Sequence, residues 1–375
     1  MPTLTASQSY TTDDPGVEPL QSGGSDADAG VSIRWGITQD TTVNLAINPD
    51  FSQVEADAAQ LEVNNQFALF FPEKRPFFLE GADYFSSPMR AVFTRTVADP
   101  SVGLKVTGKR GDHTYGLFAA EDEVTNLIFP GAFGSDSESL AQSNTSVVGR
   151  YSLGFGQSSS VGGLFTGRKG DGYHNYVGGL DARWKISDQH NVRLQYLQSS
   201  TEYPDAIAEE FEQPLGSFDG SAAQLNYNFD SRNWFAYARY SDRDEDFRAD
   251  SGFMPRVNVG TQVAGLGRVW HGEEDDWYSR IRLNGDWDIT HDDEGRMLER
   301  EVEAYLNVHG PLQSRISVGA LTRDRLFDDI LFKEDQVSAF AEFQPRGGLN
   351  LGIWARVGEQ VDFANSRLGL SLIHI

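Results

Sequence analysis

Apolar and polar residues alternate along most of the chain, from about residue 88 onward. In WYSRIRLNGDWDI (277–289), Ile281 and Leu283 fall on one face, and Arg282 and Asn284 fall on the other. Successive side chains of a β-strand point to opposite faces of its sheet, so this period of two predicts strands. The same pattern recurs in AQLNYNF (223–229), EVEAYLNV (301–308) and GLNLGIWARV (348–357).

The predicted strands are long, and the links between them alternate in length. Many strands reach ten residues or more, whereas soluble sheets usually use about five or six, and a tilted strand that crosses a membrane needs about 9–11. The short links are GFGQ (154–157), SDQH (187–190), DSRN (230–233), GPLQ (310–313) and PRGG (345–348), and the longer polar links lie near 201–217, 243–256 and 324–334.

Tight turns at one rim and longer loops at the other are typical of an up-and-down membrane barrel. A soluble β protein with uneven hairpins shares the alternation and is the competing fold. We predict an all-β fold, an antiparallel up-and-down transmembrane β-barrel of about 16–18 strands with an N-terminal lumenal or rim segment. Residues 1–30 are predicted to be a flexible acidic segment and 31–375 the barrel, with 48–81 folded inward.

The same periodicity predicts which way individual side chains face. We expect apolar positions to point outward and polar positions to point into the lumen. The outward set is Ile281, Leu283, Leu306 and Ile353, and the inward set is Arg282, Asn284, Asn307 and Asn350.

Composition narrows the classes of partner. A net charge of −24 and a pI of about 4.6 argue against a nucleic-acid-binding protein, which needs clustered Lys and Arg to neutralise phosphates. The chain has no cysteine, so disulfides and thiolate metal sites are excluded. No stretch approaches the roughly 20 apolar residues of a spanning helix. No signal peptide follows Met1, and the last predicted strand lacks a terminal aromatic, so whether the chain is a fragment stays open.

The stretch FFPEKRPFFLEG (70–81) breaks the alternation. Pro72 and Pro76 lack the N–H that a central strand needs, so the stretch cannot be a paired strand of the sheet. Its charged centre is unfavourable against lipid, while its four phenylalanines need burial. A segment folded into the lumen meets both demands, and there its charges would face the acidic lumen and set ion preference. A rim loop that helps to close the barrel is the alternative.

Two strings, NPDFSQVEAD (48–57) and FFPEKRPFFLEG, carry a family resemblance. The chain resembles Gram-negative outer-membrane barrels of unknown function that commonly follow a family-9-like carbohydrate-binding domain. The resemblance implies the bacterial outer membrane as the location. The candidate lumenal motif comprises Asn48, Pro49, Asp50, Phe51, Gln53, Glu55, Asp57, Phe70, Phe71, Pro72, Glu73, Lys74, Arg75, Pro76, Phe77, Phe78, Glu80 and Gly81.

We therefore expect a channel, transporter or surface-assembly component that residues 48–81 partly occlude. One alternative is a barrel-anchored module that binds glycans or peptides. Another is a hydrolase that uses two of the carboxylates Glu55, Asp57, Glu73 and Glu80. No catalytic residue, metal site or cofactor is predicted, because the sequence contains no GxSxG, HExxH or Walker motif. The expected partners are outer-membrane lipid, lipopolysaccharide, and a small solute or oligosaccharide.

Three acidic stretches stand in predicted loops: SDRDEDFRADSG (241–252), HGEEDD (271–276) and THDDEG (290–295). Their carboxylates suit divalent cations such as calcium, which prefers oxygen ligands, but their spacing is not that of an EF-hand. We expect solvated loops, with cation bridging to lipopolysaccharide phosphates at the outer rim as the alternative.

Overall fold

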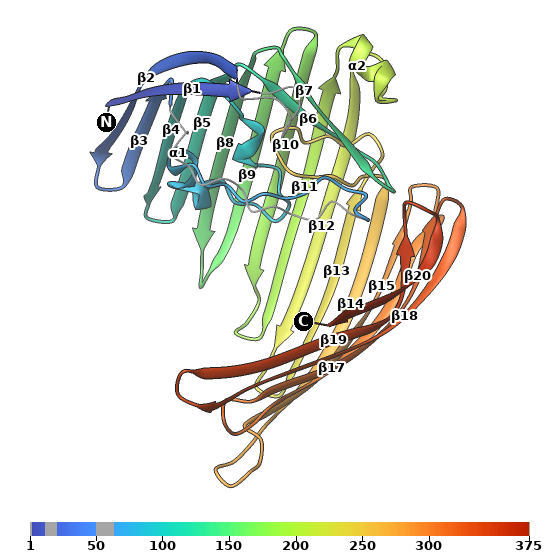
Figure 1. Ribbon diagram of the computed structural model, residues 1–375. Helices are drawn as coiled ribbons and strands as arrows, with labels where there is room; N and C mark the ends of the chain where they lie inside the picture. Colours follow the sequence, from blue (N-terminus) through green and yellow to red (C-terminus); the bar gives the residue numbers. More distant parts are fainter. Residues whose placement is uncertain (1, 12–20, 50–63, 375) are drawn as a thin grey trace.

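The structure, a computed structural model, describes residues 2–11, 21–49 and 64–374. Eighteen antiparallel strands form one sheet, and a separate hairpin forms a second, two-stranded sheet. Figure 1 shows the large sheet curved into a barrel-like wall, with a long segment of chain running across its concave side. The all-β, antiparallel, up-and-down fold and the predicted number of strands are confirmed.

The strands of the wall follow the chain in order. Its N-terminal strands are β1 (Pro2–Thr11), β2 (Gln21–Thr38), β3 (Thr41–Ile47), β4 (Pro100–Arg110), β5 (His113–Asp122), β8 (Asn144–Phe155), β9 (Ser159–Gly170), β10 (Tyr173–Lys185) and β11 (His190–Glu202). Its C-terminal strands are β12 (Phe218–Asp230), β13 (Trp234–Arg243), β14 (Val259–His271), β15 (Arg280–His291), β16 (Met297–His309), β17 (Arg315–Phe327), β18 (Ile330–Arg346), β19 (Leu349–Asp362) and β20 (Arg367–His374).

The remaining elements lie in the connections. The separate hairpin consists of β6 (Thr125–Pro130) and β7 (Ser135–Leu140). Helical turns are α1 (Pro76–Leu79), η1 (Ala82–Phe85), η2 (Thr94–Thr96) and α2 (Asp205–Glu210). None of the helices in the described ranges has the length and hydrophobicity needed to cross a membrane.

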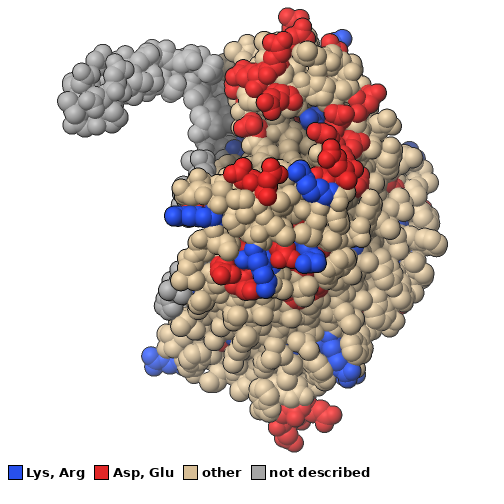
Figure 2. Space-filling model, turned by 90° about the vertical axis from the view of Figure 1, so that its right-hand side faces the viewer, with Lys and Arg blue, Asp and Glu red and all other residues tan. Residues whose placement is uncertain are grey.

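The predicted facing of the strands is confirmed. Leu283 pairs with Leu306 across β15 and β16, and both side chains are more than 40% exposed on the outward face. Ile353 on β19 is 52% exposed on the same face. Figure 2 shows this surface on the C-terminal side: charged residues gather in its upper half and at its lower tip, and the broad band between them contains few.

Two rims differ as expected. One, which we call the short-turn rim, carries tight connections such as 156–158, 186–189 and 231–233. The opposite, long-loop rim carries the β6–β7 hairpin, the connection with α2 and the segment 244–258. Because successive strands run antiparallel, alternate connections lie at opposite ends of the sheet. The exceptions to the difference in length are the tight turns 171–172 and 328–329 at the long-loop rim and the link 272–279 at the short-turn rim.

Two expectations about local structure are wrong. The predicted loop at 324–334 is strand up to Phe327 and again from Ile330, joined by a two-residue turn. Asp328 and Asp329 both have positive φ, which suits a tight hairpin turn and which Asp tolerates. Residues 21–30, predicted to be part of a flexible segment, belong to β2, where pairing with β1 outweighs their weak strand propensity.

The sheet has a first and a last strand that are not paired with each other in the described residues. Within the described residues, β1 pairs with β2 and β20 pairs with β19, and the pairings include no ladder between β1 and β20. Figure 1 shows β1–β3 and β18–β20 at the two edges of the curved wall. Contacts from segments on the concave side are therefore another way to connect the two edges of the wall.

Candidate functional site: the lumenal plug

Residues 64–99, here called the lumenal plug, belong to the connection between β3 and β4 and run across the concave face of the sheet. Their local structure explains the prolines of the FFPEKRPFFLEG motif. Pro76 stands at the start of the single-turn helix α1, where a missing N–H has no consequence. Gly81 follows with φ of +67°, a conformation that favours glycine, and begins the turn into η1. The motif is thus a compact turn and not a strand, as predicted.

A partly buried ion pair organises the centre of the motif. The guanidinium of Arg75 donates from Nε and Nη2 to the two carboxylate oxygens of Glu73, both at 2.8 Å. The hydroxyl of Thr94 adds a bond of 2.7 Å to the same carboxylate, and Arg75 also donates to the carbonyl oxygens of Thr94 and Val97. Burial raises the pKa of Glu73, but the bonds from Arg75 and Thr94 outweigh it and hold that pKa below its usual value.

The plug contacts the wall on β2–β5 through apolar and charged groups. Phe78 is 2% exposed and packs against Phe118 of β5, with ring centroids 5.8 Å apart. The ammonium of Lys105, on β4, donates to the carbonyl oxygens of Phe77 and Glu80. The expectation that phenylalanines of the motif pack on the inner wall is therefore confirmed for Phe78.

The carboxylate of Glu80 continues this contact to the edge of the sheet. Arg34 of β2 approaches it at 2.7 Å, and Asn44 of β3 donates to it at 3.4 Å. The expectation that the motif's charges pair with charges of the wall is met here. Glu73 and Arg75, by contrast, pair with each other, so the charge of Arg75 is neutralised within the plug.

The first described residues of the plug reach the other edge of the sheet. Asn64 donates to the carbonyl oxygen of Val361 at 2.9 Å and accepts from the amide of Phe363 at 2.7 Å. Val361 belongs to β19, and Arg34 and Asn44 belong to β2 and β3. One segment thus bonds to both edges of a sheet whose first and last strands are not paired in the described residues. The plug therefore lies inside the wall, as a lumenal segment would. Its contacts also join the two edges of the sheet, as those of a structural clasp would.

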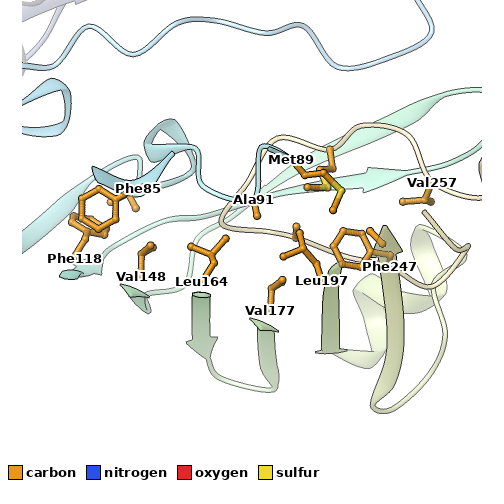
Figure 3. Packing of buried hydrophobic residues seen from close by; sticks show 14 of the residues in the cluster. Phe85, Met89, Ala91, Phe118, Val148, Leu164, Val177, Leu197, Phe247 and Val257 are labelled. Carbon is orange, nitrogen blue, oxygen red and sulfur yellow. The ribbon is translucent and has the colours of Figure 1, made fainter. Parts of the chain in front are cut away.

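A band of small and apolar side chains on the inward face receives the plug. Figure 3 shows Phe85 and Ala91 of the plug above a row of wall residues that crosses successive strands. The row consists of Phe118 (β5), Val148 (β8), Leu164 (β9), Val177 (β10), Leu197 (β11) and Ala222 (β12). Each is at most 4% exposed. Apolar residues on the inward face of a polar lumen are explained by this burial.

A second inward segment was missed by the sequence analysis. Residues 244–258, here called the inner loop, include most of the stretch 241–252 that was predicted to be a solvated acidic loop, but Phe247 is fully buried and Asp250 is 7% exposed. Asp250 accepts hydrogen bonds from the hydroxyls of Tyr173 at 2.8 Å and Tyr203 at 3.2 Å. Burial raises the pKa of Asp250, which the nearby Arg168 and these hydroxyls oppose. The prediction of a solvated loop is wrong because Phe247 and the polar partners of Asp250 draw the loop inward.

The plug and the inner loop are joined to each other. The amide of Phe93 donates to the carbonyl of Ser251 at 2.7 Å, and the amide of Phe253 donates to the carbonyl of Arg90 at 3.0 Å. Phe70, Phe93 and Phe253 form an aromatic cluster with centroids 5.1–5.4 Å apart. A Cβ on Gly252 would stand 2.5 Å from the carbonyl oxygen of Arg90, so only glycine fits this crossing.

Other predicted site residues have mixed outcomes. Asn48 adopts φ of +43° and bonds to the backbone of Ala29 and Ser101 at the start of the connection. Phe71 lies under the guanidinium of Arg95. Asp50, Phe51, Gln53, Glu55 and Asp57 lie outside the described residues. In the described part of the chain, no three acidic or histidine side chains are grouped as a metal site would require.

The plug borders two cavities. One, of about 720 Å³, lies between the plug and β4–β8 and is lined by Phe70, Glu73, Phe85, Met89, Lys105 and Phe118 among others. The other, of about 860 Å³, lies between plug residues Ser86–Pro88 and the inward face of β8–β13, and its lining is mostly polar. The plug therefore leaves space on the lumenal side of the wall.

Residues 10–107 match the model of a domain of unknown function, DUF5916. This range contains both motif strings, and the link to a carbohydrate-binding domain stays an expectation. No curated protein matches the chain. Among solved structures, BamA from Haemophilus ducreyi lacking POTRA domains 1–3 is similar, with 9% identity and a TM-score of 0.38 over 73% of this chain. The aligned part spans 66% of that protein's chain, and similarity at this level carries no information about activity.

Proposed function

We propose that this protein is an outer-membrane β-barrel whose lumen is a route for small solutes and whose lumenal plug restricts that route. The observation that supports the proposal most strongly is the contrast between the two faces of one wall. Large apolar side chains, including Leu180, Leu266 and Leu283, are about half or more exposed on the outward face. Soluble proteins rarely expose apolar patches beyond a few hundred Å², so lipid is the environment that suits this surface.

The inward face suits water. Arg323 bonds to Glu301 and lies near Glu334 across β16–β18, and Tyr237 donates to Asp286 across the lumenal face of β13–β15. Charged groups in such number are compatible with a wet lumen and incompatible with lipid contact. Aromatic residues near the short-turn rim, among them Trp184, Trp234 and Trp277, are exposed outward, as in an interfacial girdle.

Orientation follows from the rims. In outer-membrane barrels the short turns face the periplasm and the longer loops face the exterior. The plug and the inner loop both leave the wall at the long-loop rim and fold inward. We infer that they obstruct the lumen from the external side, and that the polar cavity below Ser86–Pro88 opens toward the periplasm.

The rival roles gain less support from the same contacts. Glu73 and Glu80 are each paired with an arginine, so neither is poised as one of two cooperating carboxylates for hydrolysis. A purely anchoring barrel gives no reason for a polar cavity of about 860 Å³ inside the wall. We therefore favour passage of solutes over catalysis or anchoring.

Reconstitution of the purified protein in lipid bilayers distinguishes a channel from an anchor. The purified chain should show heat-modifiable mobility on gels, which establishes a folded barrel, and discrete conductance steps in planar bilayers. Folded, inserted protein that conducts neither with its plug nor without it would overturn the channel proposal and favour an anchor.

A further inference from the structure

Below the plug, three arginines lie close together on the inward face of the wall. Arg183 on β10, Arg193 on β11 and Arg239 on β13 line the polar cavity and are exposed within it. The whole chain has a net charge of −24. An arginine cluster is therefore unexpected in so acidic a protein and indicates a specific role for these residues.

The strand register makes the cluster unfavourable on its own. Arg183 stands directly opposite Arg193, and Arg193 and Arg239 both stand opposite Asn226, one from each side. Like charges directly opposite each other destabilise a sheet. Neighbouring strands are about 4.8 Å apart, so the three long side chains can converge on one ligand.

Two carboxylates line the same cavity, and neither forms an ion pair with the cluster. Asp181 accepts two bonds from Arg150, at 2.6 and 2.8 Å, and is committed to that pair. Asp230 lies farther along β12 toward the short-turn rim and also lines the cavity. No ion pair within the described residues includes Arg183, Arg193 or Arg239.

The amides of the cavity add a second requirement. The side-chain oxygen of Asn191 is buried and has no hydrogen-bond partner in the described part of the chain. Asn226 and Asn228 line the same cavity. Amides donate and accept hydrogen bonds, and an unpartnered acceptor suits a hydroxyl group.

We propose that Arg183, Arg193 and Arg239 form a binding site for a small hydroxylated solute that carries an oxyanion, either a phosphate or a carboxylate. The guanidinium fork matches both groups through paired, charge-assisted hydrogen bonds, and the asparagines contact the hydroxyls. The inference rests on the proposed function in one respect only: the binding site lies on the solute route between the plug and the short-turn rim.

Binding to the full chain in lipid nanodiscs tests the site directly. Calorimetric titrations with glucose 6-phosphate, glucuronate and glucose compare a phosphate, a carboxylate and a neutral control. We expect binding of at least one anionic probe and none of glucose, with the stronger probe identifying the group recognised. Arg183→Gln and Arg193→Gln should each weaken binding by about tenfold or more, the loss expected for a charge-assisted contact. Arg110→Gln, at the exposed end of β4, is the matched control and should bind as the wild type does.

A second readout distinguishes a binding site from a structural role. Without ligand, Arg193→Gln removes a repulsion, so its unfolding midpoint should equal or exceed that of the wild type. A lower midpoint with unchanged affinity would overturn the proposal, as would failure of both anions to bind the wild type. Anion binding that glucose matches would also overturn it.

Conductance measurements keep this inference separate from the proposed function. If the wild type conducts and no anionic probe binds or blocks it, the site is overturned and the channel stands. If a probe binds with the expected dependence on Arg193 and neither plugged nor unplugged protein conducts, the site stands and the channel is overturned.

Discussion

The two halves of the inner wall differ, although their outward faces are alike. From β5 to β12 the inward face presents an apolar band, exemplified by Leu164 and Leu197, that packs on the plug and the inner loop. From β13 to β18 it presents charged and aromatic side chains, exemplified by Arg323 and Glu334. The outward face is apolar along both halves, whereas the inward face differs: the band on β5–β12 packs on protein, and charged side chains on β16–β18 pair with one another.

The charged side chains of β16–β18 show how a polar inward face is stabilised. Arg323 lies between Glu299, Glu301 and Glu334, and Glu334 is fully buried and also accepts from the amide of Val361. Buried charge is tolerable only where it is paired and hydrogen-bonded. In this half, the inward side chains are thus satisfied by ion pairs and hydrogen bonds with one another.

The largest effect should come from the packed half. Phe78→Ala removes a fully buried aromatic ring between plug and wall, and we expect a loss of about 3–5 kcal/mol in the free energy of unfolding. Denaturant titration in lipid vesicles measures it. Leu215→Ala, at an exposed position of the long-loop rim, is the control and should change stability by less than about 0.5 kcal/mol. Equal, small effects would show that plug and wall do not share a core.

A charge on the outward face should have a somewhat smaller effect. Leu283→Arg should destabilise the barrel by about 2–4 kcal/mol if the site lies near the middle of the membrane. Asn284→Asp, one residue along the same strand but facing the lumen, should matter far less. The same titration in vesicles compares them, and similar losses for the two variants would contradict a lipid-facing outward surface.

The Glu73–Arg75 ion pair inside the plug should contribute less to the free energy of unfolding than either site above. Its contribution should also depend on pH. Glu73→Gln should cost about 1.5–3 kcal/mol at neutral pH, the range for hydrogen bonds to charged groups. Because the folded-state pKa of Glu73 lies below its usual value of 4.5, this stabilisation is fully present above that value. It should be lost as the pH falls through the lowered pKa.

Unfolding titrations of wild type and Glu73→Gln across acidic pH measure this difference. The two proteins should converge in stability at low pH. Glu274→Gln, in an exposed loop of the short-turn rim, is the control and should track the wild type throughout. A wild-type advantage that persists unchanged to the lowest pH would mean that the carboxylate of Glu73 is not the stabilising group.

The sequence allowed the outward face to be predicted better than the inward one. Alternation identifies the outward-facing apolar set because the same period of two recurs along the strands of the wall. The packed inner band did leave a signal: Val147 with Val148 and Leu164 with Phe165 are consecutive apolar residues, as expected of strands that are buried on both faces. Each pair places one side chain outward and one against the plug or inner loop.

The inner loop and the arginine cluster were less accessible to sequence reasoning. Phe247 and Asp250 stand among acidic residues whose composition is typical of a solvated loop. Their burial depends on Tyr173, Tyr203 and Arg168, which are remote in sequence. The opposition of Arg183 and Arg193 likewise depends on the exact hairpin register, which a single residue of slip would change.

The central claim is that the plug restricts the lumen, and single-channel conductance tests it most directly. We would replace residues 70–81 by a flexible Gly/Ser segment of equal length, which keeps the chain connected while removing Phe78, Arg75 and Glu80. Heat-modifiable mobility establishes that the variant is folded. The same replacement at 273–276, on the exposed short-turn rim, is the control. The account predicts that conductance rises in the plug variant and stays at the wild-type value in the control. Unchanged conductance in a folded plug variant would contradict it and leave the segment as a structural clasp between β2–β5 and β19.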